Sequence, residues 1–260
     1  MEVTVLTDFL IQCAIVCPLV FLGSFVDSIA GGGGIITLPA YMLAGLPVHT
    51  AAGTNKLVAT FGSITASYKY FSTGNVILRI ALLSGCSALA SGALGTQLAL
   101  LIPEDILKLI MMIVLPIVAV FLSLNKDFGA KKVRSPLSRP AENVIAVGIG
   151  LVIGCYDGMI GPGTGTFLML CFTGILGLDL LVSGGCAKVA NLASNLASAV
   201  VFLFNGKAMY SLLVPAAVCS VAGGWLGSRF AVRGGAKFIR KVMFLVLLLL
   251  LVKTAYDYFA

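Results

Sequence analysis

Long apolar runs recur along the 260-residue chain and constrain its fold more than any other feature. A membrane-spanning helix needs about 20 consecutive, mostly apolar residues. Apolar runs lie at residues 9–30, 35–46, 48–71, 76–102, 105–125, 143–159, 164–178, 183–204, 208–230 and 237–256. Charged residues make up only 10% of the chain, against about 25% in soluble domains. We therefore expect an all-α integral membrane protein embedded in a lipid bilayer. The composition excludes a soluble enzyme and a nucleic-acid-binding protein.

Two of these runs, 35–46 and 164–178, are too short to span a bilayer comfortably, and each follows a glycine cluster. Residues 31–34 are all glycine, and residues 161–165 contain three glycines and a proline. Glycine and proline interrupt helices. The sequence therefore predicts two broken hairpins with glycine-rich tips at membrane depth. Such tips must be covered by protein or must line a watery cavity.

The two hairpins belong to an internal repeat. Identical residues recur at a spacing of 130 residues around the glycine clusters and of 132 residues further along each half. The matched pairs are Asp27 and Asp157, Gly31 and Gly161, Gly33 and Gly163, Lys56 and Lys188, Gly92 and Gly224, and Gly95 and Gly227. We assign residues 1–125 to a first membrane repeat, 126–142 to a basic linker and 143–260 to a second repeat. The last two glycine pairs predict close helix contacts.

Each repeat is expected to contain one re-entrant hairpin and three membrane-spanning helices, which gives about eight helical segments in the conventional count. The second arm of each hairpin reaches less than about 25 Å at 1.5 Å per residue, short of the roughly 30 Å hydrocarbon core. Three crossings per repeat is an odd number, so the two repeats should have inverted orientations. Inverted repeats with broken helices are typical of secondary transporters.

Basic residues predict the orientation in the membrane. They gather in the linker, in the loop between Lys69 and Arg79, and between Arg229 and Lys241. Cytoplasmic loops carry an excess of Lys and Arg. We therefore expect the linker 126–142 on the cytoplasmic side and both termini outside. The net charge of +7 is attributed to this bias.

Two lysines inside apolar runs are the strongest sign of a site. An ionised residue at membrane depth costs at least about 2.5–3.5 kcal/mol, so Lys56 and Lys188 need compensating partners. Helical spacing places Lys188, Asn191 and Asn195 on one face, and Asn55 adjoins Lys56. Ammonium groups and amide donors suit an oxyanion. We therefore predict that these five residues contact a small anion.

Two aspartates, Asp27 and Asp157, precede the glycine tips by four residues. They could pair with the two lysines in a purely structural role, cap helices, or carry protons in a coupled transport cycle. These alternatives stay open on the sequence alone, and pairing does not exclude anion binding. The absence of a Gly-x-Gly-Asp sequence excludes an intramembrane aspartyl protease.

The glycine tips are predicted to supply backbone donors to the same anion. The second arm of each hairpin begins just after its glycines, so its free N–H groups and positive dipole end face the protein centre. The candidate contacts are Gly31, Gly33, Gly34, Gly161, Gly163, Thr164 and Thr166. The alternative is that the glycines serve close helix packing alone.

No phosphate-binding loop follows the glycines and the cysteines show no metal-ligand spacing, so we expect no cofactor, no metal and no enzymatic activity.

The segments around the glycine clusters also carry a family resemblance. In the first half they are residues 25–34, Pro39 and Thr54-Asn55-Lys56; in the second half they are residues 156–167, Lys188, Asn191 and Asn195. These resemble the signatures of the sulfite exporter TauE/SafE family, and most of all its YfcA-like branch, over nearly the whole chain. The resemblance implies a multi-pass carrier of the inner (plasma) membrane that transports, and often exports, sulfur-containing anions such as sulfite, sulfonates or thiosulfate. Ala187 stands where the first half has Asn55, so a strictly symmetric site is not expected.

Together these observations predict a secondary transporter of small, sulfur-containing oxyanions, with export the expected direction. The partners are an inorganic or organosulfur anion and the bilayer, and proton or cation coupling is an open alternative. The competing hypotheses are a passive anion channel and a membrane scaffold without transport. The oligomeric state is not predicted.

Overall fold

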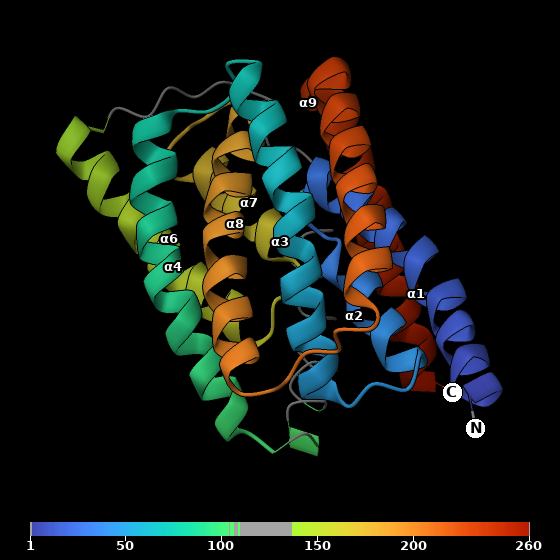
Figure 1. Cartoon of the computed structure of the whole chain (residues 1–260). Helices are drawn as coiled ribbons and strands as arrows, with labels where there is room; N and C mark the ends of the chain where they lie inside the picture. Colours follow the sequence, from blue (N-terminus) through green and yellow to red (C-terminus); the bar gives the residue numbers. More distant parts are fainter. Residues whose placement is uncertain (1, 104, 107–108, 110–136, 260) are drawn as a thin grey trace.

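The computed structural model describes residues 2–103, 105–106, 109 and 137–259, and every regular element within them is a helix. The all-α prediction is therefore confirmed. The helices are α1 (Glu2–Ala30), α2 (Gly34–Leu43), α3 (Val48–Ser72), α4 (Leu78–Leu101), α6 (Arg139–Met159), α7 (Thr164–Gly174), α8 (Leu180–Phe204) and α9 (Leu213–Phe259) (Figure 1). Nearly all of the expected span at 105–125 and most of the linker lie outside the described residues. Helix α6 already begins at Arg139, inside the segment assigned to the linker.

Helices α1 and α2 form one hairpin, and α6 and α7 form the other. Gly31 (φ 81°) and Gly161 (φ 88°) make the turns with backbone angles that glycine adopts at little cost. With 10 and 11 residues, α2 and α7 extend only about 15–16 Å. Figure 1 shows that each hairpin begins and ends at the same end of the bundle. Neither hairpin therefore passes from one end of the bundle to the other.

The first arm of each hairpin is longer than a re-entrant arm requires. Helix α1 has 29 residues and α6 has 21, because both helices extend beyond the apolar runs 9–30 and 143–159. In α6 the added turn contains a proline at the first or second helical position, where its missing N–H is tolerated. The first arm thus runs through most of the bundle, and the second arm returns only part of the way (Figure 1).

Helix α9 contains the last two predicted spans. Its backbone departs from helical geometry at Gly235 (φ 61°, ψ −165°), between the predicted segments 208–230 and 237–256. The chain reverses at this kink, and the two termini consequently lie at the same end of the bundle (Figure 1).

The opposite end of the bundle is basic. Helix α3 ends there with Lys69 in its last turn, α4 and α6 begin there, and α9 reverses there (Figure 1). The starts of α4 and α6 are joined by an ion pair between Arg79 and Glu142, and Arg79 Nη1 donates to the Arg139 carbonyl at 3.1 Å. The described parts of the three predicted basic regions therefore share one end.

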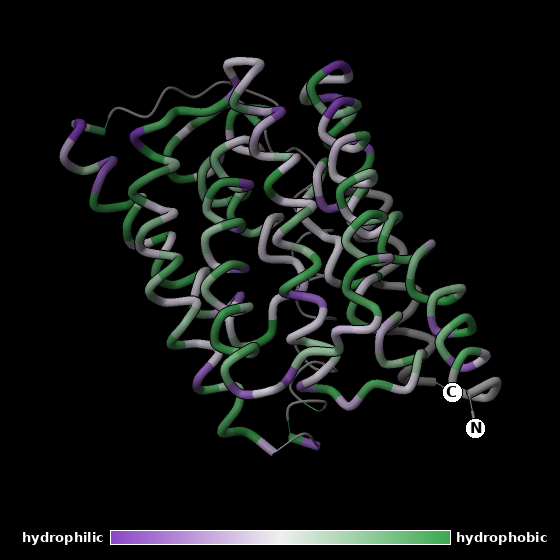
Figure 2. Tube along the Cα trace, viewed as in Figure 1, coloured by the Kyte–Doolittle hydropathy of each residue, from purple (hydrophilic) through white to green (hydrophobic). Residues whose placement is uncertain are grey.

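Apolar side chains cover the outside of the bundle. Leu82 of α4, Val152 of α6 and Val218 of α9 are 51%, 72% and 64% exposed, and hydrophobic residues extend along the helices in Figure 2. Contiguous exposed apolar surface marks contact with another apolar phase. Among the described residues, four helices are long and apolar enough to cross a membrane: Leu6–Ala30, Leu78–Leu101, Arg139–Met159 and Leu180–Phe204. These are the features of a multi-pass membrane protein.

Glycines at equivalent positions of the two halves bring each half into close contact with the other. A Cβ on Gly95 of α4 would lie 2.2 Å from the Cys155 carbonyl oxygen of α6, and a Cβ on Gly227 of α9 would lie 2.2 Å from the Phe25 carbonyl oxygen of α1. The close contacts predicted at these glycines are therefore confirmed. Helix α4 packs on α6 in the same way as α9 packs on α1. This agrees with the predicted repeat, and the inverted arrangement of the two repeats stays a prediction.

The short second arms lie inside the hydrophobic cores. Met169 and Phe172 of α7 are fully buried in one cluster, and Leu38 and Tyr41 of α2 are buried in another. Because each short arm is enclosed by longer helices, its glycine-rich beginning is held in the interior, where the candidate site forms.

Candidate functional site

The two glycine tips pack directly against each other. A Cβ on Gly31 would lie 2.2 Å from the carbonyl carbon of Gly165, and a Cβ on Gly165 would lie 2.6 Å from the Gly31 Cα. The Thr166 hydroxyl donates to the Ala30 carbonyl at 2.7 Å and so ties the start of α7 to the end of α1. The tips of the two hairpins thus meet, as expected, and their contact is backbone against backbone.

Each buried lysine pairs with the aspartate of the opposite half. Lys56 Nζ of α3 lies 2.7 Å from Asp157 Oδ1 of α6, and Lys188 Nζ of α8 lies 2.6 Å from Asp27 Oδ2 of α1. The exposed fractions of these side chains are 7% for Lys56, 2% for Asp157, 1% for Lys188 and 23% for Asp27. Pairing offsets the cost of placing these charges in a membrane interior. The pairing that the sequence left open is therefore present, and it joins the two halves.

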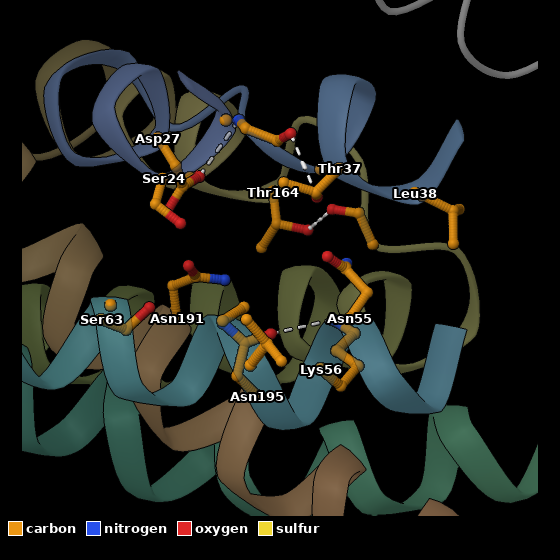
Figure 3. A pocket seen from close by; sticks show the side chains of 18 of the residues that line it. Ser24, Asp27, Thr37, Leu38, Asn55, Lys56, Ser63, Thr164, Asn191 and Asn195 are labelled. Carbon is orange, nitrogen blue, oxygen red and sulfur yellow. Dashed lines mark hydrogen bonds between the residues drawn. The ribbon is translucent and has the colours of Figure 1, made fainter. Parts of the chain in front are cut away.

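A cavity lies between the first hairpin and helices α3 and α8. In Figure 3, Asp27 and Thr37 of the hairpin face Asn55, Lys56 and Asn191 across it. The predicted residues that line this cavity are Asp27, Gly31, Gly33, Gly34, Asn55, Lys56, Asp157, Gly161, Thr164, Asn191 and Asn195. The structure therefore gathers most of the predicted site around one space.

Three amides in this cavity have hydrogen-bonding capacity to spare. Among the described residues, no hydrogen-bond partner faces the side chains of Asn55 and Asn191, although Asn191 is only 5% exposed. Lys56 Nζ donates to Asn195 Oδ1 at 3.2 Å. Because an ammonium group only donates, Asn195 must turn its oxygen toward Lys56, which leaves its NH₂ group available. These amide groups face the cavity and are therefore available to a ligand that accepts hydrogen bonds.

The two aspartates have different surroundings. Besides its lysine, Asp157 accepts from the Thr164 hydroxyl at Oδ1 (2.7 Å) and from the Ser194 hydroxyl at Oδ2 (2.5 Å). Besides its lysine, Asp27 accepts only a long backbone hydrogen bond from the Gly33 N–H to Oδ1 (3.3 Å) among the described residues. Asp157 is thus enclosed by donors, whereas Asp27 is partly open to the cavity.

Three predicted contacts, Gly163, Thr166 and Lys188, do not line the cavity. Gly163 (φ 86°) immediately precedes the first residue of α7. Thr166 holds the two tips together through its hydrogen bond to the Ala30 carbonyl. The Lys188 side chain is only 1% exposed and is paired with Asp27. Thr164 does line the cavity, but its hydroxyl already has two acceptors, Asp157 Oδ1 at 2.7 Å and the Gly161 carbonyl at 2.5 Å. The N–H groups of Gly31 and Gly161, predicted as backbone donors to the anion, already donate to the Asp27 and Tyr156 carbonyls. Of the predicted contacts, the side-chain donors that remain for a ligand are Lys56 and the amides.

Helical spacing from Lys56 predicts Ser63 on the same face of its helix, and Ser63 does line the cavity. Sequence reasoning missed two other serines: Ser24 lines the cavity, and Ser194 binds Asp157. Helical spacing could have found Ser24, because it lies one turn before Asp27. Ser194 offered no such signal, since its partner comes from another helix. Among the described residues, no three His, Cys, Asp or Glu side chains gather closely enough to hold a metal ion.

Comparisons with known proteins agree with this architecture. The family model described as "Sulfite exporter TauE/SafE" matches residues 16–254. Curated relatives include a probable membrane transporter protein, ORF9, of Sinorhizobium sp., which is 36% identical over 91% of this chain and 90% of its own length. Others are a probable membrane transporter protein of Haemophilus influenzae, 32% identical over 91% of this chain and 92% of its own, and the probable membrane transporter protein YfcA of Escherichia coli K12, 31% identical over 91% and 87%. No solved structure matches the chain.

The family model covers the hairpins, both ion pairs and the cavity, and the curated relatives align along almost all of their length. The chain belongs to the sulfite exporter TauE/SafE family of membrane transporters.

Proposed function

We propose that the protein is a secondary transporter of small, sulfur-containing oxyanions and that the anion binds in the cavity between the first hairpin and helices α3 and α8. The observation that carries this proposal is the set of available amides on Asn55, Asn191 and Asn195 beside the Lys56 ammonium. An anion with several acceptor oxygens would satisfy all of them, and charge-assisted hydrogen bonds are the strong ones. The matched family supplies the sulfur chemistry.

A carrier fits the geometry better than an open channel. The tips of the two hairpins close against each other beside the cavity, at Gly31 and Gly165, which favours an occluded site over a continuous pore. No nucleotide-binding motif is present in the sequence, so gradients must supply the energy. Each negative charge that leaves a cell with an inside-negative potential gains about 2.3 kcal/mol per 100 mV, and this favours export across the plasma membrane.

A thermal-shift screen of the purified protein tests the substrate class. Sulfite, thiosulfate or sulfoacetate should raise the melting temperature in detergent, because a ligand that binds only the folded state stabilises it. Chloride at the same ionic strength should not, since it cannot bridge several amides. Uptake of the stabilising anion into proteoliposomes should then saturate with its concentration. Equal shifts for all anions, or flux that does not saturate, would favour a passive channel, and no effect in either assay would favour a scaffold.

Substitution of Asn191 by Ala should weaken anion binding with little loss of stability. Among the described residues the Asn191 amide has no hydrogen-bond partner, so its removal leaves no other polar group unpaired. Loss of a hydrogen bond to a charged ligand costs about 1.5–3 kcal/mol. We expect affinity for the stabilising anion to fall about tenfold to a hundredfold in a titration of the melting temperature.

The matched control is Asn205→Ala, at the C-terminal end of the same helix and exposed, where the amide donates to the Val201 carbonyl at 2.8 Å. This change should leave anion affinity unaltered. If Asn191→Ala binds the anion as tightly as the unaltered protein does, the placement of the ligand beside α8 is wrong.

Cysteine labelling tests the proposed orientation. We expect the basic end of the bundle to be cytoplasmic, because Lys and Arg accumulate in cytoplasmic loops. In a cysteine-free background, an impermeant thiol reagent added to intact cells should label a cysteine at position 4 and not one at Ser138, which is exposed at the start of α6. Labelling of both positions from one side of the membrane would contradict the proposal.

A further inference from the structure

The difference between the two aspartates originates in two specific positions of the repeat. The spacing of 130 residues that relates the hairpins places Gly34 where the second half has Thr164, and the spacing of 132 places Gly62 where it has Ser194. Thr164 and Ser194 are the two hydroxyl donors of Asp157. The first half thus has glycines at both places, and both glycines line the cavity. The result is one aspartate surrounded by hydroxyls and one beside open space.

The charges of the site sum to zero before any ligand arrives. Two lysines face two aspartates in the cross-paired arrangement. An anion that enters this neutral group adds uncompensated negative charge in a membrane interior, and it does so next to the Asp27 carboxylate. A proton taken up by one aspartate would restore the balance and remove that repulsion.

We propose, on the basis of the proposed anion transport, that Asp27 takes up one proton for each anion that binds and releases it with the anion, while Asp157 stays ionised as the fixed counter-ion of Lys56. Both aspartates line the cavity, but the Asp27 side chain is 23% exposed and that of Asp157 only 2%. Protonation of Asp27 frees the positive charge of Lys188, which lies directly behind it and then attracts the anion. Asp157 has three donors and 2% exposure, so its charged form is held in place.

The groups around Asp27 fit this role. Lys188 faces it from α8, and Lys56 and Asp157 are the other charged residues that line the cavity. The Tyr70 hydroxyl of α3 lies nearby and donates to the Ser28 carbonyl at 2.9 Å. Helices α2 and α7 present no Asp, Glu, Lys, Arg or His, and the basic residues of α9 between Arg229 and Lys241 lie near its kink at Gly235. Of the side chains that the structure describes, Asp157 of α6 is the other carboxylate that lines the cavity.

Proteoliposomes with a clamped membrane potential provide the test. The probes are thiosulfate, sulfate and sulfoacetate, because sulfite itself takes up a proton near neutral pH. With the unaltered protein, movement of the anion should carry protons in the same direction, reported by a pH-sensitive dye trapped inside. An imposed pH gradient should drive the anion against its own gradient. In detergent, the affinity should fall by up to about tenfold per pH unit as Asp27 loses its proton.

Substitutions test whether Asp27 is the residue that carries the proton. Asp27→Asn should leave whatever flux remains insensitive to the pH gradient and should flatten the pH dependence of affinity, whereas Asp27→Glu should retain both responses. Gly34→Ser should give Asp27 the kind of hydroxyl donor that Thr164 gives Asp157, and it should move the pH profile of binding to lower pH. The matched control is Asp179→Asn, because Asp179 caps α8 through the Leu181 N–H at 3.0 Å, away from the cavity, and an asparagine caps equally well.

The outcomes separate the two proposals. Anion transport by the unaltered protein without proton movement and without response to a pH gradient would overturn the role of Asp27 and leave the proposed function standing. Persistence of proton coupling in Asp27→Asn would also overturn it. If the unaltered protein transports no sulfur oxyanion at any pH, the proposed function fails and this inference fails with it.

Discussion

Substitution of Asp157 by Asn should lower the free energy of unfolding by about 3–5 kcal/mol, because it leaves the Lys56 ammonium buried beside a neutral amide. Both side chains of the pair are less than a tenth exposed, and the ion pair joins α3 to α6. The Thr164 and Ser194 hydroxyls, which donate to Asp157 in the intact protein, lose a charged acceptor at the same time. The measurement is the melting temperature and the denaturation midpoint of the purified variant in detergent.

The double variant Lys56→Gln/Asp157→Asn should recover most of this loss, because no buried charge is then left without its partner. The matched control is the ion pair between Arg79 and Glu142, whose side chains are 38% and 23% exposed. Glu142→Gln should cost no more than about 1 kcal/mol, as is usual for exposed pairs. If the losses in the two single variants at Lys56 and Asp157 simply add in the double variant, the two groups do not stabilise the fold as a pair.

Substitution of Gly31 by Ala should lower stability by about 2–5 kcal/mol and abolish transport with it. The new Cβ would lie 2.2 Å from the Gly165 carbonyl carbon, so the tips would have to separate, and overpacking of this kind costs about 1–3 kcal/mol. The backbone angle φ of 81° adds about 1–2 kcal/mol for any residue with a side chain. Gly165→Ala should have a similar effect from the other side of the contact, without the cost in φ. Melting temperature and proteoliposome flux measure the two effects.

Substitutions at two further glycines separate the cost of the backbone angle from the cost of the steric contact between the tips. Gly45 has φ 88° and open space around the position of a Cβ, so Gly45→Ala should show only the conformational cost. Gly148 lies within α6 with nothing near its would-be Cβ, and Gly148→Ala should stabilise the protein by about 0.5–1 kcal/mol. A Gly31→Ala protein no less stable than Gly45→Ala would show that the two tips do not pack together as described.

The helices and the hairpins could be predicted from the sequence because they depend on local patterns. Apolar runs define the spans, and glycine clusters define the breaks, so the boundaries of α2, α3, α4 and α8 lie within three residues of the predicted ones. Helix α7 ends four residues before the predicted 178, and α9 begins five residues after the predicted 208. The extensions at Glu2 and Arg139 involve polar residues that continue a helix beyond the apolar run. Hydrophobicity detects the part of a helix that contacts lipid and not its end in the headgroup region.

The sequence identifies the two aspartates as possible partners of the buried lysines. It does not predict which aspartate pairs with which lysine, or that the two lysines differ in their access to the cavity. The sequence treats Lys56 and Lys188 as equivalents, yet only Lys56 lines the cavity. The cause is tertiary: the cavity lies on the side of the first hairpin, where glycines replace the hydroxyl residues Thr164 and Ser194. A spacing rule finds residues that share a helix face, whereas the enclosure of Asp157 and the openness of Asp27 depend on side chains from other helices.

The crossed lysine–aspartate pairs also bear on how the protein is made. While the first half alone has been synthesised, Lys56 and Asp27 lie in the membrane without their partners, because Asp157 and Lys188 have not yet left the ribosome. An unpaired charge in a bilayer favours association with whatever can neutralise it. Arrival of α6 and then α8 would neutralise these charges one after the other and lock the halves together. We therefore expect the two halves to lock together only once α8 has been inserted, and a chain truncated before α8 to lack the partner of Asp27.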